Sequence, residues 1–281
     1  MIEPKENKNA MNNTLMNGRF KYHILVSFIL LVVIISSHLG LKEVNQQLFN
    51  GINEYSKFID PRIWCSLTLF GDTSILWPML LLFMWSSPRT VFAAVLAIPV
   101  GGILSVLLKH LFNAPRPAQW SGATDITILG PVLTGNSFPS GHTITAFAAA
   151  CAIIMTIEFK NKIKQKFIAV SIFVFACFIG LSRVMVGAHW PYDVCAGACV
   201  GWIGGISGLI LADRLEIFWQ KVIIQQITLI VLWLVSFYNL FREVEYSQGV
   251  ATVWISFSLS TLGMIVFFWF SKKKPQSVAF F

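Results

Sequence analysis

Long apolar runs separated by short polar segments make up most of the chain. A bilayer is crossed by about 20 residues of helix, so runs of this length predict membrane spans. The runs lie at about 23–41, 64–85, 90–112, 142–158, 167–182, 191–212, 222–241 and 250–270. The pattern predicts an all-α, polytopic membrane bundle of eight transmembrane helices.

One compact helical domain accounts for this length. We interpret residues 23–271 as the transmembrane domain, with its core at about 65–213. Residues 1–22 are polar, Asn-rich and basic, which predicts a cytoplasmic tail, and residues 272–281 form a second short basic tail. The run at 23–41 lacks a small-residue cleavage site and is interpreted as a retained anchor rather than a signal peptide.

Two connecting segments and one carboxylate raise further expectations. Residues 42–63 mix charged and apolar positions, which favours an amphipathic helix at the membrane interface. Residues 113–139 form a long segment rich in Gly, Pro, Thr and Ser. Loops of this length in compact domains are usually functional, so we expect it to cover a site and touch the substrate headgroup. Asp72 could face the mouth of that site, or serve a helix end or the interface.

The composition excludes an ordinary soluble domain. Only 12% of the residues are charged, against about 25% in typical soluble proteins. The net charge of +8 could suggest nucleic-acid binding. Its distribution along the chain, however, follows the membrane spans instead.

The positive-inside rule orients the eight spans. With the N-terminus in the cytoplasm, 14 of the 21 Lys and Arg residues lie on that side: Lys5, Lys8, Arg19, Lys21, Arg89, Lys160, Lys162, Lys164, Lys166, Arg214, Lys221, Lys272, Lys273 and Lys274. The seven on the outer side are Lys42, Lys57, Arg62, Lys109, Arg116, Arg183 and Arg242. This bias predicts a multi-pass membrane protein with both termini cytoplasmic, and explains the basic charge without nucleic acid.

Three polar clusters stand at the outer ends of the apolar runs. Ionisable residues beside a membrane span are expensive, so they indicate a functional site. The clusters are Lys109, Arg116 and Pro117; Pro139, Ser140, Gly141 and His142; and Ser182, Arg183, His189 and Asp193. The predicted orientation places all three on the outer side, as a single active site requires.

These residue types suit phosphoryl chemistry. Arg supplies planar, bidentate donors and Lys a point charge, and three such cations (Lys109, Arg116 and Arg183) match a phosphoryl group. Ser140 and Gly141 precede a new apolar run, which predicts an N-cap followed by free backbone N–H groups that can bind an anion.

The two histidines provide the covalent chemistry. Asp193 follows His189 by four residues and can accept a hydrogen bond from one ring nitrogen, leaving the other as a nucleophile. His142 can protonate a leaving alkoxide. Each fragment alone is weak, because a lone histidine at a helix end is most often a solvated interfacial residue. The three clusters together predict a phosphoryl-transfer site.

The spacing of these residues resembles that of the type 2 phosphatidic acid phosphatases, which share a site with vanadium haloperoxidases. The chain matches the family pattern at every defining position of the three clusters. The resemblance implies a phosphohistidine on His189, orientation by Asp193 and protonation of the leaving group by His142. It also implies that Lys109, Arg116, Arg183 and the Ser140–Gly141 backbone hold the phosphoryl oxygens, without a metal or other cofactor.

The resemblance implies a lipid phosphatase of the bacterial inner (plasma) membrane that hydrolyses a phosphate or diphosphate monoester. Candidate substrates are undecaprenyl diphosphate, phosphatidylglycerophosphate, phosphatidic acid and lipid A 1-phosphate. A phosphotransferase that passes the phosphoryl group to a second lipid is the alternative, and the motifs do not separate the two. An anion transporter is disfavoured because the charges lie at span ends, and a haloperoxidase because those enzymes are soluble.

Cysteines and small residues near the third cluster have a structural interpretation. Cys195 and Cys199 are four residues apart near His189, but packing on a helix face explains them better than a metal, and no disulfide scaffold is expected. Gly197, Gly201 and Gly205 repeat at a spacing that allows close helix contact.

The last two apolar runs are interpreted as extra packing, a dimer surface or part of a groove for a lipid tail.

Overall fold

Helices account for all regular structure in the part of the chain that the structure describes. The computed structural model describes residues 5–120 and 126–271, with side chains described from Phe20 onward. The helices are α1 (Lys5–Gly40), α2 (Lys42–Glu54), η1 (Tyr55–Phe58), α3 (Pro61–Leu69), α4 (Thr73–Met79), η2 (Leu80–Phe83), α5 (Pro88–Phe112), η3 (Pro117–Gln119), α6 (Gly141–Thr156), α7 (Lys162–Met185), α8 (Pro191–Arg214), α9 (Glu216–Trp219), α10 (Val222–Asn239), η4 (Ser247–Gly249) and α11 (Ala251–Ser271). The all-α prediction is confirmed.

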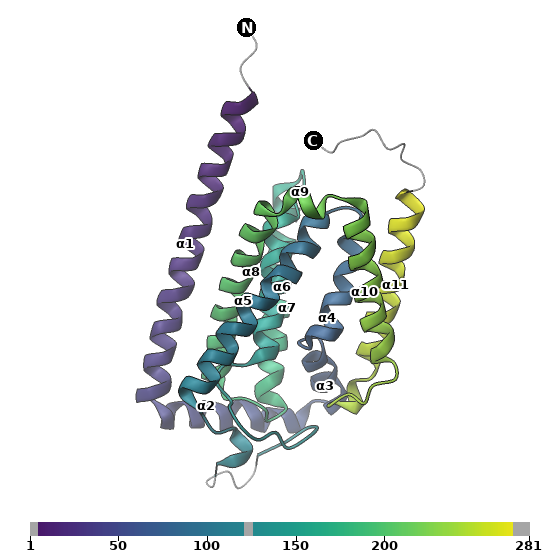
Figure 1. The fold of residues 1–281 in the computed structure, drawn as a ribbon. Helices are drawn as coiled ribbons and strands as arrows, with labels where there is room; N and C mark the ends of the chain where they lie inside the picture. Colours follow the sequence, from purple (N-terminus) through teal and green to yellow (C-terminus); the bar gives the residue numbers. More distant parts are fainter. Residues whose placement is uncertain (1–4, 121–125, 272–281) are drawn as a thin grey trace.

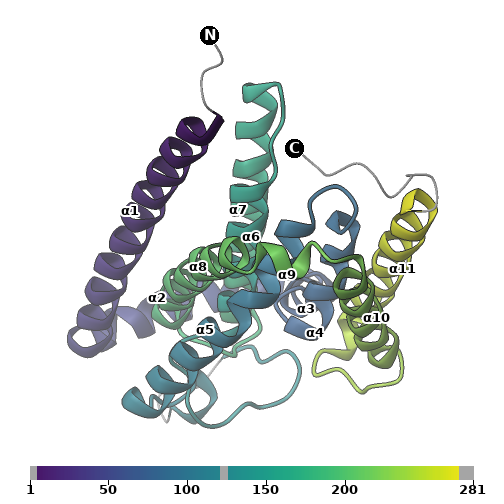
Figure 2. The ribbon, with the colours of Figure 1, turned by 45° about the horizontal axis from the view of Figure 1, so that its top comes forward.

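The long helices form one bundle around α8. Helix α8 packs against α5 and α6, with α1 and α7 outside them, while α10 and α11 pack against α4 and η2. Helix α2 crosses the end of the bundle opposite the two chain termini (Figure 1). Viewed obliquely, α1 and α11 stand on opposite flanks of the bundle (Figure 2).

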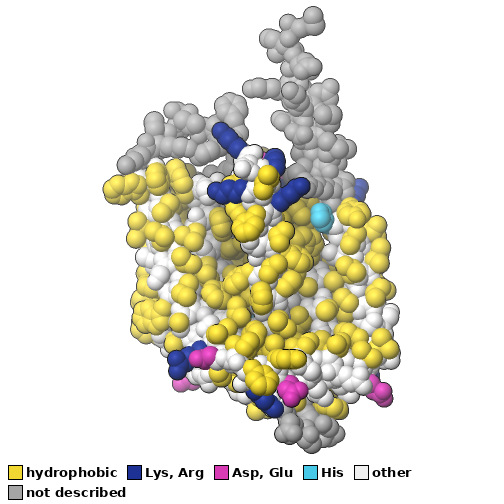
Figure 3. Space-filling view, turned by 180° about the vertical axis from the view of Figure 1, so that it is seen from behind, with side chains coloured by type: hydrophobic (Ala, Val, Ile, Leu, Met, Phe, Trp, Pro, Cys, Tyr) yellow, Lys and Arg dark blue, Asp and Glu magenta, His cyan; other side chains and the backbone are white. Residues whose placement is uncertain are grey.

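The bundle has the surface of a multi-pass membrane protein. Among the described residues, six helices are long and apolar enough to cross a membrane, or seven if one bent pair is counted as a span. Figure 3 shows an apolar belt between two ends, with Lys, Arg, Asp and Glu side chains gathered at those ends. Lipid explains why so many large apolar side chains are exposed on α1, α7, α10 and α11.

The second predicted span, 64–85, is wrong as a continuous helix. Helices α3 and α4 are bent by 72° at a break beside Gly71 and Asp72. The Asp72 carboxylate caps α4 by accepting hydrogen bonds from the backbone N–H and the hydroxyl of Ser74, both at 2.8 Å. An N-cap inside an apolar run restarts the helix in a new direction. This helix-end role is one of those considered for Asp72, which also pairs with Arg242 at 2.8 Å.

The span predicted at 142–158 is helix α6, which has only 16 residues and lies inside the bundle. Helix α8 approaches it along the predicted glycine stripe. A Cβ atom on Gly197, Gly201 or Gly205 would lie 2.7, 2.5 or 2.6 Å from an atom of α6 or of its cap, Ser140. The predicted close helix contact is therefore confirmed, and any larger side chain at these positions would push the two helices apart.

The last two spans pack onto the core through hydrogen bonds as well as apolar contacts. The Ser256 hydroxyl of α11 donates to the carbonyl of Ile75 at 2.6 Å, and that of Thr252 donates to the carbonyl of Ser66 at 3.2 Å. The Asn239 amide at the end of α10 donates to the carbonyl of Ser74 at 2.8 Å. The hairpin of α10 and α11 thus holds both sides of the α3–α4 break.

The N-terminal part of the chain is more helical than the sequence predicted. Residues 42–54 form a helix, α2, as predicted. Residues 5–22, interpreted as a tail, are helical because α1 begins at Lys5. The C-terminal tail, 272–281, lies outside the described residues. All five cysteines are free, with Cys199 buried and Cys195 exposed on α8.

Candidate active site

The structure brings the three sequence clusters to one end of the bundle. Because successive helices run in opposite directions, the ends of α5 and α7 and the starts of α6 and α8 lie together there (Figure 1). Helix α5 ends at Asn113, whose φ of 40° and ψ of 40° are left-handed, a conformation that Asn tolerates. The chain turns there toward Arg116, and His189 lies in the turn between α7 and α8.

His189 and Asp193 form a buried pair. The Nδ1 atom of His189 lies 3.4 Å from Oδ2 of Asp193, and the two side chains are 3% and 0% exposed. Ser137 contacts both: its hydroxyl donates to Oδ2 of Asp193 and lies 3.3 Å from Nδ1 of His189. The backbone N–H of Trp190 also donates to Oδ2 at 3.0 Å, so the carboxylate is fixed from three sides.

These contacts assign the tautomer of His189. Nη1 of Arg116 lies 3.2 Å from Nε2 of His189. Guanidinium nitrogens only donate, so Nε2 accepts and Nδ1 carries the hydrogen that faces Asp193. Burial, together with the positive charges of Arg183 and then Arg116, lowers the pKa of His189 well below its ordinary value. The imidazole is therefore neutral at physiological pH, with its Nε2 lone pair directed to the cationic side of the site.

Arg116 and Lys109 extend along the segment that covers the site. Nη1 of Arg116 also donates to the carbonyl of Ala188 at 2.8 Å. Nζ of Lys109 donates to the carbonyl of Asn136 at 3.4 Å. Both bonds use neutral carbonyls, so neither cation is neutralised by a carboxylate through them, and both charges remain available to an anion.

Arg183 is the most deeply buried of the three cations, at 1% exposure. Its Nη1 atom donates to the hydroxyls of Thr68 and Tyr246, the latter at 3.0 Å. Its guanidinium also lies over the Tyr246 ring, 5.3 Å from the ring centre. Thr68 belongs to α3 and Tyr246 to the α10–α11 connection, so two distant parts of the chain hold this one side chain.

Several buried polar atoms at this end have no partner among the described residues. They include the Nε atoms of Arg116 and Arg183 and Oδ1 of Asp193. Leaving a buried donor without an acceptor costs about 1–3 kcal/mol, and more when the group is charged. Two unpaired guanidinium donors in one site can therefore bind an anionic acceptor.

Ser140 caps α6 as the sequence predicted. Its hydroxyl accepts from the backbone N–H of Thr143 at 3.4 Å, and its own N–H donates to the carbonyl of Asp193 at 3.0 Å. A Cβ atom on Gly141 would meet no described atom within 4 Å. The first turn of α6 thus faces open space beside the cations, and its free N–H groups can donate hydrogen bonds to an anion there.

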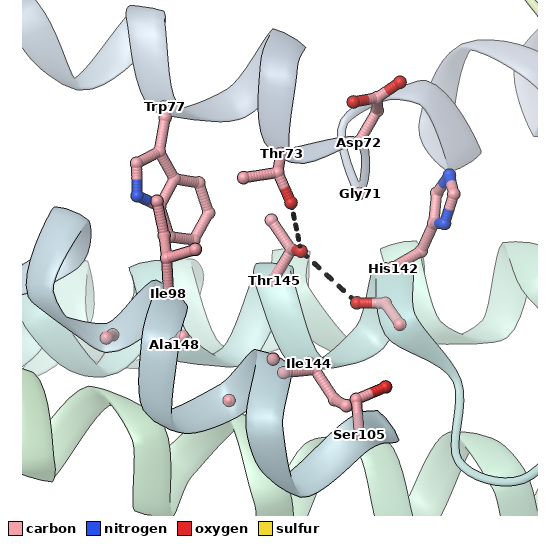
Figure 4. Close-up of a pocket in the computed structure, with 14 residues that line it drawn as sticks. Gly71, Asp72, Thr73, Trp77, Ile98, Ser105, His142, Ile144, Thr145 and Ala148 are labelled. Atoms are coloured by element: carbon pink, nitrogen blue, oxygen red, sulfur yellow. Dashed lines mark hydrogen bonds between the residues drawn. The ribbon is translucent and has the colours of Figure 1, made fainter. Parts of the chain in front are cut away.

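His142 lies in the first turn of α6, and Figure 4 shows its ring directed toward the break that bears Gly71 and Asp72. A Cβ atom on Gly71 would lie 2.6 Å from Cβ of His142, so only glycine permits this approach. His142 stands at the polar end of a groove of about 350 Å³ between α4, α5 and α6. The groove continues along Trp77, Ala97, Ile98, Gly101, Gly102 and Ala148.

The described parts of the long loop, 113–120 and 126–139, lie over the site as predicted. Its backbone is tied down at Leu129, whose N–H donates to the carbonyl of Val186 at 3.1 Å. Asn53 of α2 clamps the same region. Its amide donates to the carbonyls of Thr127 and Val184, both at 3.0 Å, and accepts from the N–H of Thr127 at 2.8 Å.

The sequence analysis missed Ser137, Thr68 and Tyr246. Ser137 lies two residues before the Pro139 motif in a long polar loop, so only its position near the motif could have indicated it. Thr68 and Tyr246 are 115 and 63 residues from Arg183 in sequence. No local pattern marks either residue, because their role arises from packing of the appended hairpin and the broken helix.

Part of this chain is similar in sequence to known phosphatases. The relatives include a lipid A 1-phosphatase of Rhizobium etli, 36% identical over 116 residues, which are 40% of this chain and 46% of that protein. An undecaprenyl-diphosphatase of Sulfolobus acidocaldarius is 26% identical over 197 residues, 68% of this chain and 91% of that protein. The match to the first of these thus spans less than half of that relative's length.

A solved structure shares the fold. The transmembrane PAP2 type phosphatidylglycerolphosphate phosphatase from Bacillus subtilis aligns with 70% of this chain and 99% of its own, at a TM-score of 0.54 and 20% identity. The PAP2 superfamily model matches residues 90–218, a segment that contains all three sequence clusters. Residues 90–218, whose motif residues gather at one end of an all-α membrane bundle, thus form a PAP2 superfamily segment of this chain.

Proposed function

We propose that this protein is a membrane phosphatase that hydrolyses a phosphate or diphosphate monoester of a lipid through a phosphohistidine at His189. The observation that carries the proposal is the position of the His189 imidazole, held by Asp193 on one side and bonded by Arg116 on the other, in a site where the Nε atoms of Arg116 and Arg183 have no partner among the described residues. A nucleophile beside an oriented carboxylate and a cationic pocket is the arrangement that covalent phosphoryl transfer needs.

The cations would bind the phosphoryl oxygens. Nε of Arg116 and Nε of Arg183 are the unpaired donors, and Lys109 adds a third charge. The bond from Arg116 to Nε2 of His189 has to be exchanged for a bond to a phosphoryl oxygen before Nε2 can attack. Because three fixed cations can balance the charge of the transferring group, we propose that the reaction needs no metal ion.

His142 would act on the leaving oxygen. In the first step Nε2 of His189 forms a bond to phosphorus while the bond to the lipid oxygen breaks, and His142 gives that oxygen a proton. In the second step His142 takes a proton from water, whose oxygen attacks phosphorus and releases His189. Asp193 holds the Nδ1 hydrogen throughout and stabilises the charge that His189 gains.

The groove beside His142 supports a lipid as the leaving group. Its polar end contains Asp72, Thr73 and Thr145, with the two threonine hydroxyls 2.9 Å apart, and the remainder is largely apolar (Figure 4). An alcohol protonated by His142 would therefore have its hydrocarbon chain along α4 and α5, in contact with the membrane interior.

We propose that the active site faces the outside of the bacterial inner (plasma) membrane. The bias of Lys and Arg toward the opposite end supports this orientation. The similarity to a lipid A 1-phosphatase and to an undecaprenyl-diphosphatase supports a lipid phosphate as the substrate.

The test is phosphate release from a panel of purified lipids in detergent: undecaprenyl diphosphate, phosphatidylglycerophosphate, phosphatidic acid and lipid A. We expect release from at least one lipid, with inhibition by vanadate, which mimics five-coordinate phosphorus. Activity lost in a chelator and restored by a divalent metal would contradict the metal-free mechanism. Release that requires a second lipid as acceptor would establish the phosphotransferase instead.

Filling the groove should reduce activity on long-chain substrates. Gly102 lines the groove, and a Cβ atom there would meet no described atom within 4 Å, so Gly102→Leu can fold while narrowing the groove. Loss of contact with about two methylene groups, at about 0.8 kcal/mol each, predicts an about tenfold lower kcat/KM. A water-soluble short-chain phosphate should be affected less than about twofold.

The matched control is Gly51→Leu on α2, where a Cβ atom also meets open space and which does not line the groove. We expect it to leave both substrates unaffected. Equal losses of kcat/KM for the long and short substrates in Gly102→Leu would refute the assignment of the groove to the lipid chain.

A further inference from the structure

The connection between α10 and α11 reaches into the active site. Tyr246 lies in this connection and is 1% exposed. Its hydroxyl accepts a hydrogen bond from Nη1 of Arg183 at 3.0 Å, and its ring lies beneath the same guanidinium. Residues 90–218 match the family model, so Tyr246 comes from a part of the chain outside the matched segment.

The surroundings of Tyr246 fix its position. Gly130 of the long loop packs against the ring, where a Cβ atom would lie 2.7 Å from Cδ1 of Tyr246. On the other side, a Cβ atom on Gly249 would lie 2.6 Å from the carbonyl of Cys65, so the connection lies directly against α3. The adjoining hairpin is bonded to the core through Thr252, Ser256 and Asn239. The hydroxyl of Tyr246 is therefore held rigidly against Arg183.

The hydrogen bonds of Arg183 engage one nitrogen of its guanidinium and leave another free. Thr68 and Tyr246 both accept from Nη1, whereas Nε is buried without a partner among the described residues. Two acceptors on one nitrogen fix the rotation of the planar group. Arg183 lies close enough to His189 for its positive charge to lower the pKa of that imidazole, so the free Nε belongs to the same site.

We propose that Tyr246 is a positioning residue, which orients Arg183 for the phosphoryl group and makes the α10–α11 hairpin part of the catalytic unit. This inference rests on the proposed function, because Arg183 is taken to bind the phosphoryl oxygens. Tyr246 acts through Arg183 and not on the reacting atoms. Without its hydroxyl, Thr68 alone holds Nη1, and the guanidinium can rotate away from the phosphate.

The test is Tyr246→Phe in the full-length protein. This change removes the hydroxyl and keeps the ring that packs against Gly130. Loss of one hydrogen bond to a charged group predicts an about tenfold lower kcat/KM on the lipid that the wild type hydrolyses. The inhibition constant for inorganic phosphate should rise by a similar factor, since a misdirected Arg183 binds any phosphate less well. Tyr238→Phe is the matched control, because Tyr238 lies on α10 of the same hairpin and is 62% exposed.

A double-mutant cycle with Arg183→Lys separates positioning from a purely structural role. Lysine has one nitrogen and cannot bond to Tyr246 through one atom while presenting a second donor to phosphate. Adding Tyr246→Phe to Arg183→Lys should therefore change the inhibition constant for inorganic phosphate less than twofold. A full tenfold effect in that background, or an unchanged Tyr246→Phe enzyme, would overturn the proposal. If the wild type hydrolyses no lipid, the proposed function fails separately. The dissociation constant for inorganic phosphate, measured on the wild type, the two single variants and the double variant, then tests the role of Tyr246.

Discussion

Replacing His189 with Asn is expected to lower phosphate release by at least about 10⁴-fold, the scale of loss when a catalytic nucleophile is removed. Asn can still donate a hydrogen bond toward Asp193 but has no counterpart of Nε2, the atom placed 3.2 Å from Arg116. The expected loss therefore reports the nucleophile rather than collapse of the buried pair. The measurement is initial-rate phosphate release on the best lipid of the panel.

The covalent intermediate gives this prediction a second measurement. Wild-type protein incubated with a labelled lipid phosphate and quenched in alkali should retain label in a bond that acid releases, as expected for phosphohistidine. The Asn variant should retain none. His110→Asn is the matched control, because His110 is exposed on α5 and the same substitution there should leave labelling and turnover intact. Residual activity above about 1% in the His189 variant would refute the assignment of the nucleophile.

Replacing His142 with Ala is expected to lower activity on lipid phosphates about 10³-fold, within the range usual for loss of a general acid. The reason is that a lipid alkoxide is a poor leaving group and needs a proton as the bond to phosphorus breaks. The p-nitrophenolate of a p-nitrophenyl phosphate ester leaves without protonation. Formation of the phosphohistidine from this ester should therefore slow less than about tenfold. The measurement compares single-turnover labelling of the variant by the two substrates.

The ratio between the two substrates separates the acid role from a binding role. His142 lies at the mouth of the groove beside Gly71, so its removal could also disturb the entry of the lipid. A disturbed entry would raise KM for the lipid without lowering the single-turnover rate at saturation. Equal losses of that rate for good and poor leaving groups would contradict the general-acid role.

Much of this site could be predicted from the sequence because its chemistry is local. His189 and Asp193 share one helix turn, and Ser140 caps the helix that it precedes, so spacing alone predicts their relation. The antiparallel order of long apolar helices then brings Lys109, Ser140 and His189 to the same end. These relations depend on chain direction and helix period, both of which can be read from the order of residues.

The parts that the sequence did not predict depend on packing between distant segments. The apolar run 64–85 contains a cap, Asp72, whose effect on helix direction depends on Arg242 and the hairpin that bears it. The partners of Arg183 come from α3 and from the α10–α11 connection. Thr68 and Tyr246 are each ordinary residues in their own segments, and only the assembled bundle makes them neighbours of a cation.

The shortness of α6 bears on how the proposed phosphatase would meet its lipid substrate. Sixteen residues of helix rise about 24 Å, at about 1.5 Å each, less than the roughly 30 Å of hydrocarbon that a bilayer presents. A helix this short does not reach both headgroup layers, so we infer that the proposed phosphate site at the start of α6 lies below the outer one. A lipid can enter it by lateral diffusion, without being extracted into water. Turnover should then follow the mole fraction of the lipid within the membrane plane, rather than its bulk concentration.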